Sequence, residues 1–271
     1  MRWWRTANTE TGWGFILISL VLVLGVFVPI ISPFDTESSV GPALSPPSVT
    51  HLFGTDQLGR DVFVRAFAAA RLDIALALIC VVLPLTIGTA VGSLAGTTTA
   101  LGIDALWTAI VEAINALPFI VLAIAILSVL GAGTFSLIAA LTLTNWARYA
   151  RLVRSKALAL RAAPFIEATR VLGYSRVRVL VRHIVPNVMG ESIAYGVSDF
   201  VIVIVVVSGL SFIGLGIQPP TPEWGSMMAD GRLFLQSHPW MIIAPGLVLS
   251  ITAIAVAMLA QGLLRSARGE N

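Results

Sequence analysis

The stretch PFIEATRVLGYSRVRVLVRHIVPN, residues 164–187, brings four arginines into a chain that is otherwise strongly apolar. Hydrophobic residues make up 57% of the 271 residues and charged residues 11%, whereas soluble domains carry about 25% charged residues. The mean hydropathy is +0.91. This composition indicates a membrane protein, and the quoted stretch must then lie outside the bilayer.

Six apolar windows flank this stretch, and a bilayer-spanning helix needs roughly 20 such residues. The windows cover residues 13–31, 74–98, 105–130, 134–150, 187–213 and 241–264. Because backbone groups in lipid must be hydrogen-bonded within the chain, we expect all six to be helical, including the β-branched run at 201–207. The fourth window is the weakest, since Thr142, Thr144 and Asn145 interrupt it. The predicted fold class is therefore all-α, with six transmembrane helices.

The first window follows Arg2 and Arg5 and could instead be the core of a cleaved signal peptide. Its apolar run is long for such a core, and no small-x-small cleavage site follows it. We therefore expect an uncleaved span.

Basic residues are concentrated on one side of the six predicted spans. The termini supply four and residues 148–182 supply nine, so thirteen of the seventeen share a side. Cytoplasmic loops keep such positive charge, so we expect both termini and the quoted stretch to be cytoplasmic. The resulting division is a cytoplasmic N-terminus at 1–12, a first transmembrane helix at 13–31, an external loop at 32–71, a five-helix core at 72–264 with a cytoplasmic loop at 151–186, and a cytoplasmic tail at 265–271.

Local signals within residues 164–187 predict two short helices. Pro164 suits a first helical turn, Glu167 lies near the positive end of the helix dipole, and Gly173 suits a left-handed cap. Ser175 can cap the second helix, which we expect to lie along the membrane surface. Its apolar face is predicted to hold Val177, Leu180, Val181 and Ile184. The alternative is a hairpin whose arginines only bind lipid phosphates and fix topology.

The sequence EATRVLG at 167–173, followed by HIVPN at 183–187, resembles the EAA loop of ABC importer permeases. Thr169, His183 and Val185 depart from that pattern, and the His-x-x-Pro-Asn ending is similar to the peptide and nickel branch. The resemblance implies that this helix docks onto a separate ATPase subunit. It assigns the docking to Glu167, Ala168, Thr169, Arg170, Gly173 and Tyr174, and a loop-to-helix junction to His183, Pro186 and Asn187.

Two further stretches resemble the second permease subunit of dipeptide and oligopeptide importers. FGTDQLGRDVFVR at 53–65 is similar to its segment after the first span, and LSFIGLGIQPPTPEWGSMMADGR at 210–232 to its segment between spans five and six. Without the resemblance, they read as a turn and a Pro/Gly-rich external loop. The first motif consists of Gly54, Thr55, Asp56, Gly59, Arg60 and Asp61. The family's usual C-terminal pattern is missing at 257–271.

The sequence contains no catalytic motif. Lys156 is the only lysine and no G-x-x-x-x-G-K-[ST] surrounds it, while His51, His183 and His238 are far apart and form no H-E-x-x-H. We therefore expect no enzymatic activity, no cofactor and no metal site in this chain. The resemblance implies that partner ATPase subunits bind ATP and Mg²⁺.

Polar residues inside the predicted spans are candidates for a translocation pathway, because ionisable groups are costly in lipid. Glu191 and Asp199 lie in the fifth span, and Ser198 shares nearly one helical face with Glu191. Glu112, in the third span, is either a pathway residue or a partner for the loop arginines. A repeated G-x-x-x-G at residues 88–96 predicts close helix packing, either within the chain or against a partner permease.

These motifs imply a permease subunit of an ATP-driven ABC importer in the bacterial inner membrane, serving short peptides. The implied partners are a second homologous permease, ATPase subunits and an external substrate-binding protein, with lipid around the spans. Nucleic acid is not expected, because no soluble basic face is visible. The same machinery could import nickel, haem or another small solute. A carrier driven by an ion gradient is a weaker alternative, since no internal repeat is found, and a scaffold or sensor would require an accidental motif match.

Overall fold

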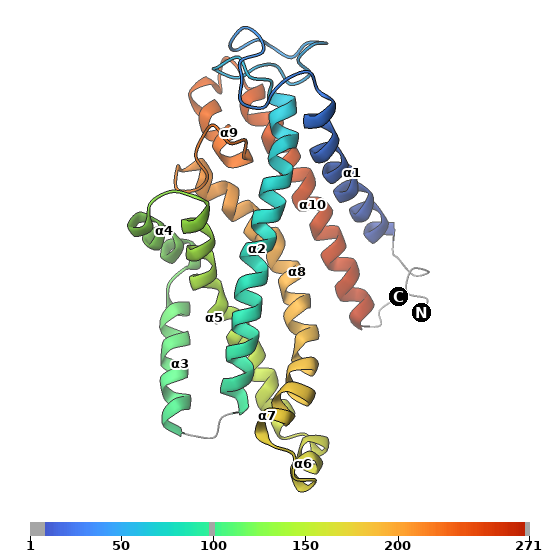
Figure 1. The fold of residues 1–271 in the computed structure, drawn as a ribbon, viewed down its shortest axis with the longest axis vertical. Helices are drawn as coiled ribbons and strands as arrows, with labels where there is room; N and C mark the ends of the chain where they lie inside the picture. Colours follow the sequence, from blue (N-terminus) through green and yellow to red (C-terminus); the bar gives the residue numbers. More distant parts are fainter. Residues whose placement is uncertain (1–8, 98–100, 269–271) are drawn as a thin grey trace. The chain divides into compact units, whose positions relative to one another are not determined.

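The computed structural model describes residues 9–97 and 101–268, and every regular element in these ranges is helical. The all-α prediction is therefore confirmed. The elements are α1 Thr9–Ile31, α2 Val62–Thr97, α3 Leu101–Ala116, α4 Phe119–Leu130, α5 Thr134–Arg161, α6 Pro164–Val171, α7 Arg176–Val179, a π-helical segment Leu180–Ile184, α8 Val185–Phe212, α9 Trp224–Gly231, a 3₁₀ turn Arg232–Phe234 and α10 Trp240–Arg268 (Figure 1). Of the predicted terminal segments 1–12 and 265–271, residues 1–8 and 269–271 lie outside the described residues.

Within the described ranges, four helices are long and apolar enough to cross a membrane, and a bent pair raises the number to five. The four are α1, α2, the continuous helix Arg176–Phe212 and α10. The predicted fourth window became α5, which continues to Arg161 and gathers five basic residues along its second half. Because of these charges, α5 is not among the candidate membrane spans. Composition and length therefore support four or five spans and not the predicted six.

The window at 105–130 was predicted as one span, and the structure divides it. It forms two helices, α3 and α4, bent by 89° relative to each other. The break contains Pro118, which has no N–H to donate and whose ring collides with the carbonyl four residues earlier in a continuous helix. Proline thus converts an uninterrupted apolar run into a broken span or a re-entrant loop.

The chain forms two compact units. Unit 1 contains residues 1–78, 127–137 and 200–271, and unit 2 contains residues 79–126 and 138–199. In unit 1, α1 packs along α10. The two helices approach closely at Gly14, since a Cβ added to this residue would lie 2.8 Å from the carbonyl oxygen of Ala255. Gly262 faces Thr11 in the same way.

In unit 2, the G-x-x-x-G residues of α2 pack against α5. A Cβ added to Gly88 would lie 2.5 Å from that of Tyr149, and one added to Gly92 would lie 2.5 Å from the carbonyl oxygen of Ala150. Thr89, on the same helix, donates a hydrogen bond to Ser192 of α8 at 3.0 Å. The close packing predicted from the glycine pattern therefore occurs within this chain.

Candidate functional site

The helix α6 has the termini that the sequence predicted. It begins at Pro164, and Gly173 follows its end with a φ of +75°. The N–H of Tyr174 donates to the carbonyl of Thr169 at 3.1 Å, which closes the cap. No atom lies within 4 Å of a Cβ built on Gly173. The glycine is therefore needed for its backbone conformation and not for space.

One buried side chain fixes α6 to the rest of unit 2. Ile166 is fully buried in a cluster with apolar residues of α5, α7 and α8. The other members of this cluster are Val153, Ala157, Val179, Ile184 and Val188. Thr169 is also buried, and its hydroxyl donates to the carbonyl of Ile166 at 2.7 Å. These two residues hold α6 in place.

The rest of α6 and the turn after it face outward. Glu167 and Ala168 are exposed, and so are three large apolar side chains, at 46% for Phe165, 88% for Val171 and 71% for Leu172. We call Phe165, Val171 and Leu172 the α6 tip. The side chain of Arg170 lies outside the described part of the chain. Exposed apolar clusters of this kind mark interaction surfaces.

The predicted second helix begins as expected, with Ser175 accepting a hydrogen bond from the N–H of Arg178 at 3.3 Å. The prediction of a separate helix was wrong, whereas Ile184 of its predicted apolar face is buried and Leu180 packs against the same cluster. The segment is no separate surface helix, because α7 passes through the π-helical segment directly into α8. Val177 and Val181, predicted on its apolar face, are 70% and 62% exposed.

Proline again accounts for the difference. Pro186 lies in the first turn of α8, so the carbonyl of Arg182 loses its usual partner four residues on. The π-helical turn adjusts the helix at this point. The amide of Asn187 then donates to the carbonyl of His183 at 2.6 Å. The changed register buries Val179, which was not on the predicted face, together with Ile184, which was.

The structure does not bring the three pathway candidates to one place. Glu191 is exposed and its Oε1 lies 2.6 Å from Nζ of Lys156. Asp199 is buried and its Oδ2 accepts a hydrogen bond from the hydroxyl of Tyr149 at 2.9 Å. The hydroxyl of Ser198 donates to a backbone carbonyl of its own helix at 3.3 Å.

Sequence reasoning missed the residues that surround Asp199. Arg148 lies close to Asp199 and Tyr195, and its guanidinium stacks over the ring of Phe119 at 4.3 Å. A weak signal was available, because two of the three tyrosines in the chain lie here. Glu112 pairs with Arg151 at 3.1 Å, as the alternative of a structural partner predicts.

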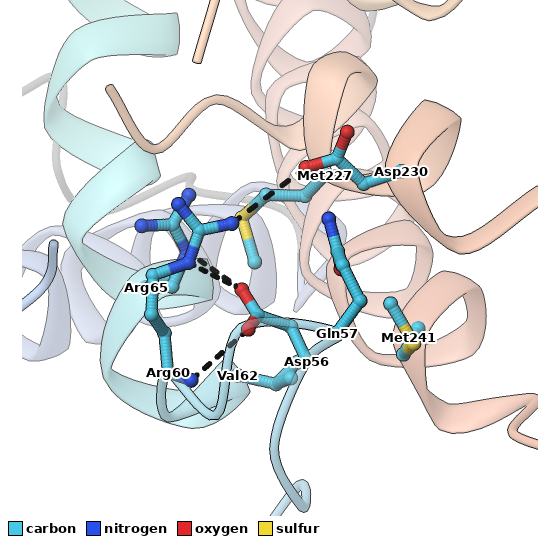
Figure 2. Close-up of a pocket in the computed structure, with 8 residues that line it drawn as sticks. All are labelled: Asp56, Gln57, Arg60, Val62, Arg65, Met227, Asp230 and Met241. Atoms are coloured by element: carbon cyan, nitrogen blue, oxygen red, sulfur yellow. Dashed lines mark hydrogen bonds and ion pairs between the residues drawn. The ribbon is translucent and has the colours of Figure 1, made fainter. Parts of the chain in front are cut away.

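In unit 1, the motif at 53–65 forms a tight polar turn (Figure 2). Oδ1 of Asp56 accepts from the N–H groups of Leu58 and Arg60, and its Oδ2 lies 2.6 Å from Nε of Arg60. Nε of the buried Arg65 lies 3.8 Å from that same oxygen. Gly54 and Gly59 have φ values of +72° and +74°. The turn predicted from the local sequence is confirmed.

The last motif residue begins the next helix. Oδ1 of Asp61 accepts from the N–H of Val64 at 2.9 Å, which makes Asp61 the N-cap of α2. Its Oδ2 lies 2.7 Å from Nδ1 of the largely buried His51. Thr55 is fully buried and donates to the carbonyl of Pro42 at 2.6 Å.

The motifs at 53–65 and 210–232 meet inside unit 1, which their separate sequences did not indicate. Nη2 of Arg60 lies 3.7 Å from Oδ2 of Asp230, and Nη2 of Arg65 donates to the carbonyl of Pro220 at 3.2 Å. Nε1 of the buried Trp224 donates to the carbonyl of Ala66 at 2.8 Å. A cavity of about 10 Å³, roughly one water molecule, remains among the residues of Figure 2.

Comparisons with known proteins agree with this architecture. The family described as binding-protein-dependent transport system inner membrane component matches residues 88–268. The dipeptide transport system permease protein DppC of Alkalihalophilus pseudofirmus is 36% identical over 92% of this chain and 82% of its own. The oligopeptide permease OppC of Bacillus subtilis is 35% identical over the same shares.

A nickel transport permease and a solved structure extend the comparison. NikC of Escherichia coli strain K12 is 33% identical over 97% of this chain and 95% of its own. The crystal structure of an amino acid ABC transporter with histidines shares the fold at a TM-score of 0.56, with 16% identity over 75% of this chain and 94% of that one. With its apolar helices, buried motif turns and family match, the chain belongs to the binding-protein-dependent inner membrane components, the permease subunits of ABC importers.

Proposed function

We propose that this permease subunit imports short peptides, forming the pathway with a second homologous permease in the bacterial inner membrane. The support comes from the relatives named for dipeptide and oligopeptide transport, each aligned with 92% of this chain. An external substrate-binding protein delivers the substrate. Nickel is the competing substrate, because a nickel permease is aligned at 33% identity.

The α6 tip docks onto separate ATPase subunits, which bind ATP and Mg²⁺. The observation that carries this proposal is the contrast along one short helix: Ile166 is fully buried, whereas Val171 and Leu172 are 88% and 71% exposed. A surface that is apolar and also held rigidly is suited to a protein partner. Glu167 and Ala168 add a charge and a small side chain that permits close approach.

The proposed topology has six spans with both termini in the cytoplasm. Its support is the contact between α5 and the glycines of α2, which gives α5 a buried place despite its charges. The basic second half of α5 then lies toward the cytoplasmic side together with α6. Lipid surrounds the remaining apolar faces.

The pathway candidates have different roles in this proposal. Glu191 is half exposed and can meet a solute directly, with Ser198 further along the same helix. Asp199 is enclosed and holds Tyr149 and Arg148 in position. It therefore acts as a positioning residue.

Docking is tested by affinity purification of the whole transporter. Leu172→Asp places a charge on the α6 tip, and Leu233→Asp places one on an equally apolar residue of unit 1 that is 85% exposed. The ATPase is expected to be lost from the first variant and retained by the second. Retention by both would contradict docking at α6.

Substrate class is tested by uptake into membrane vesicles that contain the complete transporter. ATP-dependent accumulation of labelled dipeptides is expected, and accumulation of Ni²⁺ without peptide would assign the nickel alternative.

A further inference from the structure

Asp73 of α2 carries a carboxyl group that is shielded from solvent. Its side chain is fully buried within unit 1. Oδ2 accepts a hydrogen bond from the backbone N–H of Trp224, at the start of α9, at 3.0 Å. Oδ1 is buried and has no hydrogen-bond partner. A buried acceptor left without a donor is costly, and such atoms need an explanation.

A second buried carboxyl group lies at the same helix start. Glu223 is the N-cap of α9, and its two oxygens accept from the N–H groups of Gly225 at 2.9 Å and Ser226 at 2.6 Å. Its side chain is fully buried. Burial raises the pKa of Glu223 above its ordinary value, against the opposing effect of these two N–H groups.

The described part of the chain offers no cation to this pair. No ion pair involves Asp73 or Glu223 there, and residues 200–212 of α8 and 240–264 of α10 contain no ionisable side chain. The other charged residues near α9 face elsewhere. Asp230 pairs with Arg60, Arg65 binds the carbonyls of Thr36 and Pro220, and Arg71 and Arg232 make no ion pair with either acid.

We propose that Asp73 and Glu223 form a proton-binding site that fastens α9 to α2, with the bound proton on Oδ1 of Asp73. This oxygen alone among the four lacks a donor, so a proton there gives it a hydrogen and leaves one negative charge on the pair. Two adjacent buried carboxylates cannot both stay ionised without a counter-ion. The remaining charge belongs on Glu223, which accepts two N–H bonds at a helix N-terminus.

A proton fits the site better than a metal ion. Three of the four carboxyl oxygens already accept backbone N–H groups, whereas Ca²⁺ and Mg²⁺ need six or more oxygen ligands. Proton loss would leave two anions at the start of α9 and separate the helix from α2. Because the proton-bound form is the folded one, stability is lost as the pH rises.

The first test is infrared spectroscopy of the purified full-length protein in lipid nanodiscs. The pH-difference spectrum of the wild type is expected to contain the C=O stretch of a buried protonated carboxyl group. Asp73→Asn should remove that band, and Glu112→Gln, at an exposed and ion-paired acid, should leave it. A band that persists in Asp73→Asn, or one absent from the wild type, overturns the assignment.

The second test measures thermal unfolding from mildly acidic to mildly alkaline pH. The wild-type Tm is expected to fall by about 3 °C for each pH unit between the ordinary carboxyl pKa and the pH at which the folded pair loses its proton, because only the folded state binds the proton in that range. Above that range the Tm should level off, and Asp73→Asn should remove the slope because the amide mimics the neutral acid. Failure of Asp73→Asn to fold would mean that Asp73 must be ionised, which contradicts the proposal. A Tm that rises with NaCl over choline chloride would identify a cation site instead and overturn it too.

Discussion

The hydroxyl of Tyr149 donates a hydrogen bond to Oδ2 of Asp199 across 2.9 Å, joining α5 to α8 inside unit 2. Asp199 is buried, and Arg148 lies close to it. A buried carboxyl group on a long apolar helix is therefore held by a hydroxyl and lies near an arginine. This places its function in the arrangement of the helices.

Removing the Tyr149 hydroxyl should destabilise the protein, because it leaves the buried carboxyl group of Asp199 with one donor fewer. Tyr149→Phe is expected to lower the free energy of unfolding by about 1–3 kcal/mol, because Asp199 loses a donor that no water replaces. Tyr174→Phe is the control, since Tyr174 is 36% exposed. Thermal unfolding in detergent measures both, and equal stability of the two variants would contradict the role of this bond.

Replacing a glycine of α2 by alanine should destabilise the protein far more than replacing a glycine elsewhere in unit 2. Gly92→Ala places a methyl group 2.5 Å from the carbonyl oxygen of Ala150, so we expect a loss of about 1–3 kcal/mol. Gly190→Ala meets no atom within 4 Å and should keep or slightly raise stability through helix propensity. Chemical denaturation of the two variants provides the comparison, and a stable Gly92→Ala protein would mean that α2 and α5 are not in contact.

Gly173 should tolerate residues according to backbone conformation and not size. Gly173→Asn is expected to retain peptide uptake, because asparagine adopts positive φ readily, whereas Gly173→Val should cost about 1–2 kcal/mol locally and displace the α6 tip. ATP hydrolysis and uptake are measured in the same vesicles. Hydrolysis that continues without uptake is the expected result for the valine variant, and normal uptake would show that the cap plays no part in coupling.

The Asp56 ion pairs should dominate the stability of the turn at residues 53–65. Asp56→Ala leaves Arg60 and Arg65 buried without their carboxylate and is expected to cost about 3–5 kcal/mol. Asp230→Asn, at a side chain that is 28% exposed and 3.7 Å from Arg60, should cost at most about 1 kcal/mol. Tm values of both variants give the ranking, and the reverse order would refute it.

Local signals in the sequence were sufficient where a few neighbouring residues determine the structure. The proline start and glycine end of α6, the Ser175 cap and the turn around Asp56 all depend on contacts within about five residues, and all were predicted. The prolines were harder to interpret. Pro118 and Pro186 lie in apolar runs, and hydropathy alone does not show whether a helix breaks, bends or changes to a π-turn.

Long-range relationships were beyond prediction for a different reason. The contacts of Trp224 with Asp73 and Ala66 join residues 151 and 158 positions apart, and no periodicity encodes such a pairing. The register of α7 also depends on Ile166 offering an apolar partner from another helix. Which face of an amphipathic segment is buried depends on the helices around it as much as on its own residue pattern.

The burial of Ile166 has a mechanical consequence. Its side chain is enclosed by residues from α5, α7, the π-helical segment and α8, and a close-packed enclosure resists the opening of any gap. A force applied to the α6 tip is therefore shared at once by the ends of two long helices. Ile166 therefore couples α6 mechanically to the two long helices. A smaller side chain there would let the α6 tip move without moving those helices.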